Sequence, residues 1–407
     1  MQYNIAMKTV LQHFIIGIFS ASLFSAFIYF EYFHLTNKLL NTIFALASLA
    51  LLLHIPKRSV IIAGFFIGIF WFYWIGYSFA YQGVGYVTPF IPFVFGFIYA
   101  LFFTPLALTN QPYLRAIFLF LLSFVEPMNF NWLNIELLFI ESYIGIFKYQ
   151  LFIVLLSLVL THYLQKPYKY FAPLLLIVTL NITPHIPQEA PLRIKLVQTM
   201  IKQEDKWKRE YLGITFQIIN TKIEEAIKEG YDVVVLPESV FPIYMNKNKP
   251  ILESLLQKSH QITIVAGSLI SEKQKHYNVT YKFEDGNYTI AKKVVLVPFG
   301  EYIPLPKFAR QYINDTFFAG ASDFVGAKNP TDFEIKGIMF RNAICYEATT
   351  DKIYEGDVKY VIAISNNGWF TPSIEPILQN LLLRYYARKN NVYIYHSANM
   401  AGTTTIF

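Results

Sequence analysis

Three residues of this chain could together carry out nucleophilic catalysis: a cysteine, a glutamate and a lysine. Cys345 is the single cysteine among 407 residues, which excludes an intrachain disulfide and argues against a cysteine-rich zinc site. Its thiol is either a nucleophile or an inert buried group, and cysteine is among the most buried residue types. Glu238 and Lys293 could supply the general base and the positive charge that a thiol needs to react at neutral pH.

Each of these residues stands at the edge of an apolar run that is typical of a buried strand. The run Val233–Pro237 ends at Glu238. The run Gly337–Ala343 leads to Cys345, and Lys293 begins a third apolar run. Taken one at a time, a glutamate after a strand is usually a solvated or capping residue, and a lysine before an apolar run usually limits aggregation. The three side chains therefore indicate a catalytic site only as a set.

The second half of the chain alternates strands with helices, which predicts an α/β domain with a mixed sheet or a pair of sheets. Two extended runs flank Glu284–Asn287, a sequence typical of a hairpin turn. Strands are expected at residues 192–198, 233–237, 262–267, 277–283, 288–292, 337–343, 360–365 and 392–397, and helices at 208–229, 251–260 and 376–390. The chain has no glycine-rich phosphate loop and no metal-ligand spacing, so neither a cofactor nor a metal is expected.

The composition indicates an integral membrane protein, because 54% of the residues are hydrophobic and 18% are aromatic. Residues 1–185 hold 8 of the 34 lysine and arginine residues and 4 of the 27 acidic residues. We therefore expect a transmembrane domain over residues 1–185 and a water-facing domain over residues 191–407. The net charge of +7 is modest, and no basic block with interleaved aromatic residues suggests nucleic acid binding.

The transmembrane domain is expected to have about seven helices, given a hydrocarbon core about 30 Å thick. The apolar segments are roughly 9–30, 37–54, 58–80, 87–108, 112–126, 149–165 and 169–183. Residues 127–148 are too polar to span and are predicted to lie on the surface as an amphipathic segment. With the N-terminus inside, the inner loops carry six basic residues and the outer loops two, so residues from about 186 onward are expected outside the cytoplasm. No aspartate or lysine lies in the interior of a span, away from its ends, which favours anchoring and lipid access over transport.

Glu238 in a Val-x-x-Pro-Glu string, Lys293 before an apolar run and Cys345 in Cys-Tyr-Glu resemble the Glu-Lys-Cys triad of the nitrilase superfamily. The string Leu296–Pro304 is more specific. It resembles the signature of the apolipoprotein N-acyltransferase family, membrane-embedded nitrilase relatives that add the third acyl chain to bacterial lipoproteins. The resemblance covers essentially the whole chain and includes Gln198, Lys206-Trp207, Asn366–Phe370 and Ser397–Gly402.

The sequence departs from the family pattern at three places. Ala291 stands where such enzymes often carry tyrosine, and Lys293 rather than the adjacent Lys292 is selected by its distance to the string that begins at Leu296. Asn367-Gly368 stands where aspartate and a small residue are usual. The family normally continues with further sheet and a last membrane span, so we expect either a truncated chain or an unusually short branch.

The resemblance implies an α-β-β-α sandwich with a catalytic triad, three supporting residues and three aromatic residues at the substrate opening or its lid. The triad is Glu238, Lys293 and Cys345. The supporting residues are Glu301, Tyr346 and Glu347. The aromatic residues at the opening or lid are Trp207, Trp369 and Phe370. The aromatic residues could equally be ordinary core or interfacial side chains. No cofactor is implied.

The implied reaction is ping-pong transfer of an acyl chain from a membrane phospholipid, through a cysteine thioester, to the N-terminal amine of a diacylglyceryl-cysteine apolipoprotein. The expected location is the bacterial inner membrane, with the catalytic domain on the periplasmic side, and the expected state is a monomer. Two alternatives stay open. One is a membrane-tethered nitrilase-like amidase that uses the same triad with water as acceptor, and the other is a non-catalytic membrane scaffold or carrier.

Overall fold

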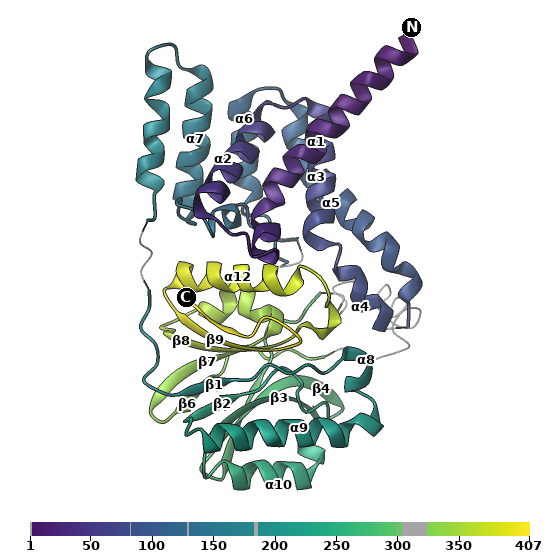
Figure 1. Cartoon of the computed structure of the whole chain (residues 1–407), viewed down its shortest axis with the longest axis vertical. Coiled ribbons are helices and arrows are strands. Elements are labelled where there is room, and N and C mark those ends of the chain that lie inside the picture. The colour runs from purple at the N-terminus through teal and green to yellow at the C-terminus, as the bar shows by residue number, and fades with distance from the viewer. Residues whose placement is uncertain (1, 82, 128–129, 183–185, 299, 303–323) are drawn as a thin grey trace. The chain divides into compact units, whose positions relative to one another are not determined.

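A computed structural model describes residues 2–81, 83–127, 130–182, 186–298, 300–302 and 324–407 (Figure 1). The chain divides into two compact units. The first comprises Met1–Ala80 and Val84–Pro184, and the second comprises Tyr81–Gly83 and His185–Phe407.

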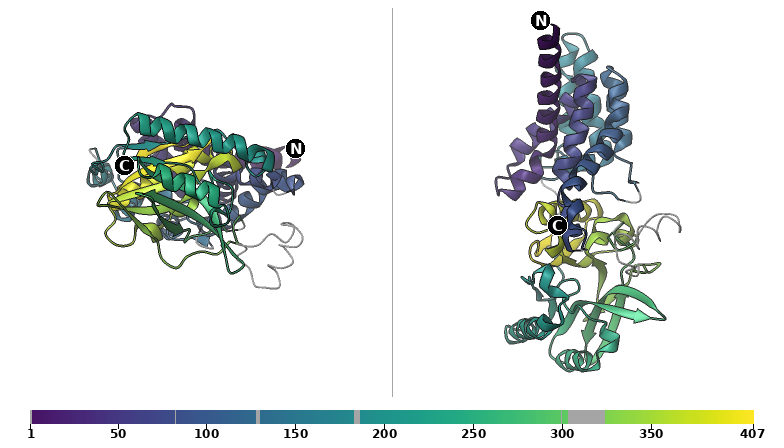
Figure 2. Two further views of the ribbon diagram at one scale, coloured as in Figure 1. Left: turned by 90° about the horizontal axis from the view of Figure 1, so that it is seen from below. Right: turned by 90° about the vertical axis from the view of Figure 1, so that its right-hand side faces the viewer.

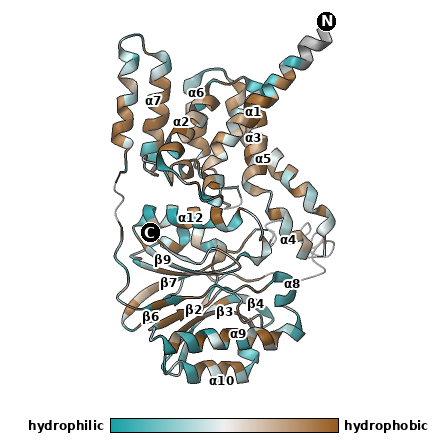
Figure 3. Cartoon of the chain, viewed as in Figure 1, coloured by the Kyte–Doolittle hydropathy of each residue, from teal (hydrophilic) through white to brown (hydrophobic). Residues whose placement is uncertain are grey.

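The first unit is built from helices that are mostly apolar along their length (Figure 3). Its α-helices are α1 (Gln2–Tyr32), α2 (Lys38–His54), α3 (Lys57–Phe72), α4 (Ile75–Tyr81), α5 (Ile91–Leu108), α6 (Pro112–Leu122) and α7 (Lys148–Tyr163). Short 3₁₀ helices lie at Gly85–Phe90, Ile135–Phe139, Tyr168–Tyr170 and Ala172–Thr179. Phe93, Phe97 and Leu101 follow one another at helical spacing on α5 and are 52%, 67% and 68% exposed, as expected of a lipid-facing surface.

Among the described residues, two helical segments are long and apolar enough to cross a membrane, Lys8–Tyr32 and Gly85–Leu108. A third is obtained if α3 and α4, which meet at a bend of 47°, form one span. The remaining apolar helices are shorter, at Lys38–His54, Pro112–Leu122, Lys148–Tyr163 and Tyr168–Thr179. The sequence-based count of seven spans stays a prediction.

Helices α3 and α5 pack closely because glycines face the contact. A Cβ atom on Gly68 would lie only 2.4 Å from the carbonyl oxygen of Phe95, so a larger residue would push the two helices apart.

The prediction of a surface-lying segment at residues 127–148 is wrong for its described part. Trp132 is 3% exposed, and all residues of the 3₁₀ helix Ile135–Phe139 are buried. Glu136 and Lys148, two of the polar residues that suggested a surface location, are instead paired with each other at 2.5 Å. A buried carboxylate with its own cation does not require solvent, which is why polarity alone misplaced this segment.

The described residues of the second unit form two five-stranded sheets. The first has the order β1 (Ile194–Leu196), β2 (Val233–Val235), β3 (Thr263–Glu272), β4 (Lys275–Glu284) and β5 (Asn287–Lys292). The second has the order β10 (Thr404–Ile406), β9 (Tyr393–Asn399), β8 (Tyr360–Asn366), β7 (Ile338–Ile344) and β6 (Asp332–Ile335). Three strands in each sheet, β1–β3 and β7–β9, are parallel, and the other pairings are antiparallel.

The sheets stack face to face with helices outside them, which confirms the predicted α-β-β-α sandwich (Figures 1 and 2). Helices α9 (Arg209–Lys228) and α10 (Lys249–Lys258) cover the first sheet, and α12 (Glu375–Asn390) covers the second. Val233 and Val235 point into the core between the sheets, whereas Val234 points toward the covering helices. A strand buried on both faces explains why this run is apolar without alternation.

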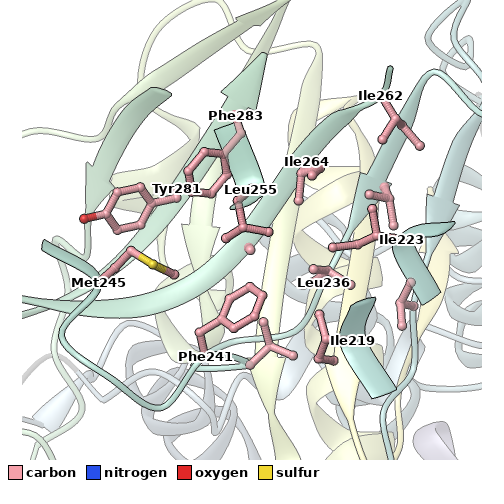
Figure 4. Close-up of a cluster of buried hydrophobic side chains, with 14 of the residues drawn as sticks. Ile219, Ile223, Leu236, Phe241, Met245, Leu255, Ile262, Ile264, Tyr281 and Phe283 are labelled. Carbon is pink, nitrogen blue, oxygen red and sulfur yellow. The ribbon is translucent and has the colours of Figure 1, made fainter. Parts of the chain in front are cut away.

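The core between the first sheet and its helices is a continuous apolar cluster (Figure 4). Ile219 and Ile223 of α9 and Leu255 of α10 pack against Leu236 and Ile264. This packing anchors the strands whose ends carry the polar residues of interest.

The predicted hairpin is confirmed, with Glu284 opposite Asn287 and positive φ angles of 49° at Asp285 and 74° at Gly286. The sequence did not predict β6 and β10. Both are short strands at the edges of the second sheet, and β6 alternates exposed and buried residues, so neither produces a strong apolar run.

Candidate active site

Glu238 lies in a turn that follows β2 and passes close to β3. Ser239 has a φ of 46°, which makes the turn tight. A Cβ atom on Gly267 of β3 would lie 2.4 Å from the Ser239 amide nitrogen and 2.6 Å from the Glu238 Cα atom. Only glycine allows this approach, so Gly267 determines where the Glu238 carboxyl is held.

Lys293 directly follows β5, and its ammonium group is enclosed by two carboxylates. The side chain is 1% exposed, and Nζ lies 2.8 Å from Glu301 Oε2 and 3.8 Å from Glu238 Oε1. Burial by itself lowers the pKa of Lys293, but the negative charges of Glu301 and Glu238 outweigh it and raise the pKa above its usual value. The ammonium group therefore stays charged.

Cys345 follows β7 at the first position of the 3₁₀ helix Cys345–Thr349. Its φ is 56°, in the left-handed region that disfavours a residue with a side chain. The residue is partly exposed, and Gln379 of α12 directs Nε2 toward Sγ at 3.8 Å. This backbone holds the thiol at the end of the strand, where the residue packs against the core between the sheets.

The thiol and the two charged residues interact electrostatically. Burial raises the pKa of the Cys345 thiol well above its usual value, the charge of Glu238 raises it further, and the charge of Lys293 opposes both. The raised pKa favours the protonated thiol, so attack requires a base that removes the proton.

Asn278 of β4 joins the two carboxylates on the Lys293 side of the site. Its Nδ2 donates to Glu238 Oε1 at 2.7 Å and to Glu301 Oε1 at 3.2 Å. Glu301 Oε2 also accepts from the backbone N–H of Val297 at 2.9 Å. The sequence did not single out Asn278, because one polar residue in a strand is usually on the solvent face.

Glu347 ties the cysteine turn to the segment that follows Lys293. Its carboxylate accepts three backbone N–H groups, from Ile344 at 2.7 Å, Val294 at 2.6 Å and Val295 at 3.1 Å. Burial raises the pKa of Glu347 to about 7, against the charge of Lys293 and these donors. The structure therefore brings Glu238, Lys293, Cys345, Glu301 and Glu347 together.

A second buried ammonium group, that of Lys206, lies beside the turn of Glu238. Lys206 ends α8 (Gln203–Lys206), is 1% exposed and donates from Nζ to the Glu238 carbonyl oxygen at 3.0 Å. Burial lowers the pKa of Lys206 to about 8, although the charges of Glu238 and Cys345 favour its charged form. The sequence placed Lys206 in the family pattern without giving it a role.

Buried amide side chains hold Gln379, the residue of α12 that faces the Cys345 thiol, in place. Asn367 donates from Nδ2 to Gln379 Oε1 at 3.1 Å and to the Ala401 carbonyl oxygen at 2.9 Å. Asn399 accepts from the Thr199 hydroxyl at 2.8 Å. These contacts join the segments at Asn366–Phe370 and Ser397–Gly402 and orient the amide that faces the thiol.

The aromatic candidates are placed less directly. Trp207 follows Lys206 and is 45% exposed, while Trp369 and Phe370 are half-buried at the end of a 3₁₀ helix that follows β8. Tyr346 is buried next to the thiol. The structure brings none of the three aromatic rings into a hydrogen bond with a triad side chain among the described residues, so their role at the opening stays a prediction.

Part of the signature string lies outside the described residues: Phe299, Ile303 and Pro304. In the described part of the chain, no group of three or more histidine, cysteine, aspartate or glutamate side chains is arranged to hold a metal ion. What the described groups can do is covalent catalysis: a thiol nucleophile, a carboxylate base and an ammonium group that can stabilise an oxyanion.

Comparison with protein families gives two matches along the chain. Residues 11–182 match the apolipoprotein N-acyltransferase integral membrane domain, and residues 193–406 match the carbon-nitrogen hydrolase family. The chain is 42% identical over 393 residues to the apolipoprotein N-acyltransferase of Wolinella succinogenes, which covers 96% of this chain and 95% of that protein. It is 34% identical over 389 residues to the enzyme of the same name from Campylobacter jejuni, covering 94% and 86%.

Among solved structures, part of the chain is similar to a CN-hydrolase superfamily protein from Xanthomonas campestris. The sequence identity is 15% and the TM-score is 0.41, with 52% of this chain and 77% of that chain covered.

Proposed function

Because this chain belongs to the apolipoprotein N-acyltransferase family, we propose that it transfers an acyl chain from a membrane phospholipid, through a thioester on Cys345, to the N-terminal amine of a diacylglyceryl-cysteine apolipoprotein. The acyltransferase activity follows from the family. The observation that most supports the thioester route is the buried ammonium group of Lys293, held between Glu301 and Glu238 beside the single thiol.

In the first half-reaction, Glu238 takes the thiol proton and Sγ attacks the carbonyl carbon of the phospholipid ester. Lys293 and a backbone N–H near Tyr346 stabilise the oxyanion. The ester C–O bond breaks, Glu238 returns the proton to the leaving oxygen, and a lysophospholipid departs. The acyl chain stays on Cys345 as a thioester.

In the second half-reaction, the free amine of the apolipoprotein attacks the thioester carbonyl. A C–N bond forms and the C–S bond breaks, while the remaining N–H proton moves through Glu238 to the departing thiolate. A thioester suits this step because an amine displaces a thiol readily and the amide product is stable. Gln379 Nε2, 3.8 Å from Sγ, is placed to donate to the thiolate as it leaves.

The helical unit anchors the enzyme where both lipid substrates reside. Its match to the family's integral membrane domain supports this role. We place the enzyme in the inner membrane with the catalytic unit on the periplasmic side, on the strength of the basic residues in the short loops.

A second candidate function is hydrolysis of an amide with the same triad and water as the acceptor. It is favoured by the match of residues 193–406 to the carbon-nitrogen hydrolase family. The two functions share the thioester and differ only in the group that receives the acyl chain.

The test uses the full chain in mixed micelles with a phospholipid that carries a radiolabelled acyl chain. We expect label on the protein that hydroxylamine releases, and transfer of that label to a diacylated lipopeptide added later. Cys345→Ala should show neither. If Cys345→Ala still forms the N-acylated product, the thioester route through Cys345, which both functions share, is wrong. Release of ammonia from a small amide, with no lipopeptide product, would favour the amidase over the acyltransferase.

A further inference from the structure

Glu375, the first residue of α12, is a buried carboxyl that the mechanism above does not use. It is 1% exposed, and its Oε2 has no hydrogen-bond partner among the described residues. A buried polar atom without a partner destabilises a protein, and such atoms are uncommon in native structures. An unpartnered atom at this place therefore suggests that a ligand supplies the missing contact.

Two observations place Glu375 at the active site. Burial, and after it the negative charge of Glu238, raise the pKa of Glu375 well above its usual value, and Glu375 in turn raises the pKa of Cys345. Gln379, which faces Sγ at 3.8 Å, lies one helical turn after Glu375. Residues four apart share a helix face, so the face of α12 that carries Glu375 is the one turned to the thiol.

Of the other carboxyls of the site, Glu238 is the base used above, and Glu301 and Glu347 already have several hydrogen-bond partners. Glu301 binds Lys293, Asn278 and the Val297 N–H, and Glu347 accepts three backbone N–H groups. Of these four carboxyls, Glu375 is the one with a buried oxygen that has no hydrogen-bond partner in the described part of the chain.

We propose that Glu375 binds the terminal ammonium group of the acceptor and takes a proton from it, so that a free amine meets the thioester on Cys345. This inference rests on the proposed function, because it requires an acyl-enzyme and an amine acceptor. An ammonium group cannot attack a carbonyl, so a site that uses an amine at neutral pH needs a group to deprotonate it.

The protons balance as follows. When the ammonium group arrives, the Glu375 carboxyl releases its own proton to water, because an adjacent positive charge favours the carboxylate. The ammonium group passes one proton to that carboxylate. The amine then attacks, its second proton moves through Glu238 to the Cys345 thiolate, and the amide departs. No bond other than C–S breaks at the acyl carbon, and nothing is oxidised or reduced.

The experiment measures the two half-reactions separately on Glu375→Gln, which keeps the size of the side chain and removes its acid–base function. Thioester formation is followed with the radiolabelled phospholipid, and aminolysis is followed by adding the diacylated lipopeptide to the labelled enzyme. We expect aminolysis to slow at least about tenfold more than thioester formation, as for loss of a charge-assisted hydrogen bond. Glu375→Asp, which retains a carboxyl, should recover part of the rate.

Two comparisons separate amine handling from a structural role. Hydroxylamine is largely uncharged at neutral pH, so the rate of its reaction with the thioester should be alike in wild type and Glu375→Gln.

The second comparison varies the pH. An α-amino group titrates at about 7.7–8.0, so the aminolysis defect of Glu375→Gln should shrink between pH 6.5 and pH 9. Among the described residues, the titratable groups that interact electrostatically with Glu375 are Glu238 and Cys345, and both variants retain them. Glu210→Gln removes an exposed acid from the first turn of α9 and is the control for loss of a helix-terminal charge.

The outcomes distinguish the two proposals. If the wild type forms no thioester, the proposed function fails. If the wild type forms the thioester and Glu375→Gln transfers it to the lipopeptide as fast as wild type, the proposed function stands and the role of Glu375 is wrong. The same conclusion holds if the defect is equal with hydroxylamine, because then Glu375 supports the thioester instead of the amine.

Discussion

At the scale of single residues, the site depends on charges that compensate one another away from water. Lys293 is the central one, since its ammonium group lies against Glu301 and Glu238 with almost no solvent contact. Removing one partner of a buried ion pair leaves the other charges uncompensated, which is far more damaging than removing an exposed pair.

Lys293→Met should therefore lower the rate of thioester formation by at least about a hundredfold and reduce the free energy of unfolding by about 3 kcal/mol. The matched control is Lys292→Met. Lys292 is adjacent and pairs with Glu272 at 2.6 Å on the surface, where its loss should change stability by less than about 1 kcal/mol. Equal effects of the two variants on labelling and thermal unfolding would contradict the assignment of Lys293.

The buried lysine at position 206 should make stability depend on pH. Its pKa is about 8 in the folded chain and near 10.5 when unfolded, so the unfolded chain binds more protons between these values. The contribution of Lys206 to stability therefore rises from pH 8 to pH 10.5. Lys206→Met removes this titration, so the variant should lose about 3 kcal/mol relative to wild type as the pH rises through that window. Thermal unfolding in detergent at pH 7 and pH 10 measures it, with the exposed Lys208→Met as a control whose difference from wild type should stay nearly constant.

At the scale of elements, the ends of the strands position the triad, and Gly267 of β3 allows the turn that carries Glu238 to lie close to that strand. Gly267→Ala would bring a Cβ atom to 2.4 Å from the Ser239 nitrogen, which forces the Glu238 turn away from β3. We expect thioester formation to fall at least about tenfold, since a base must lie within hydrogen-bond reach of its proton. Gly213→Ala, in α9 with open space around it, should instead stabilise the chain by about 1 kcal/mol and keep activity. Activity measured on both purified variants decides this.

The same elements explain what the sequence could predict. Val233–Val235 is an apolar run and Ile338–Ile344 is mostly apolar, and each is followed by a candidate catalytic residue, so both strands and the residues Glu238 and Cys345 could be located. Gln379 and Glu375 could not, because their importance comes from a helix that packs across the second sheet onto the thiol. Asn278 was also not singled out. A polar residue in a strand usually faces solvent, but β4 is buried on both faces over part of its length, so Asn278 points to the buried site.

At the scale of the whole molecule, the chain joins a helical membrane unit to a carbon-nitrogen hydrolase unit. The distribution of basic residues predicts which side of the membrane each loop faces. A cysteine placed at residue 210 in a Cys345→Ala background should react with a membrane-impermeant maleimide added from the periplasmic side. A cysteine at residue 166, an exposed position between α7 and the following 3₁₀ helix, should not react until the inner membrane is opened. Reversed labelling would overturn the proposed orientation.

The left-handed backbone conformation of Cys345 lowers the thermal stability of the protein at the residue that its activity requires. A side chain at a φ of 56° carries a conformational penalty of about 1–2 kcal/mol that glycine does not. Cys345→Gly should therefore unfold at a higher temperature than Cys345→Ala, although both lack the nucleophile, and thermal unfolding of the two side by side tests this. Selection for thermal stability alone would favour glycine at this position. The cysteine is therefore retained for activity, at a cost in stability.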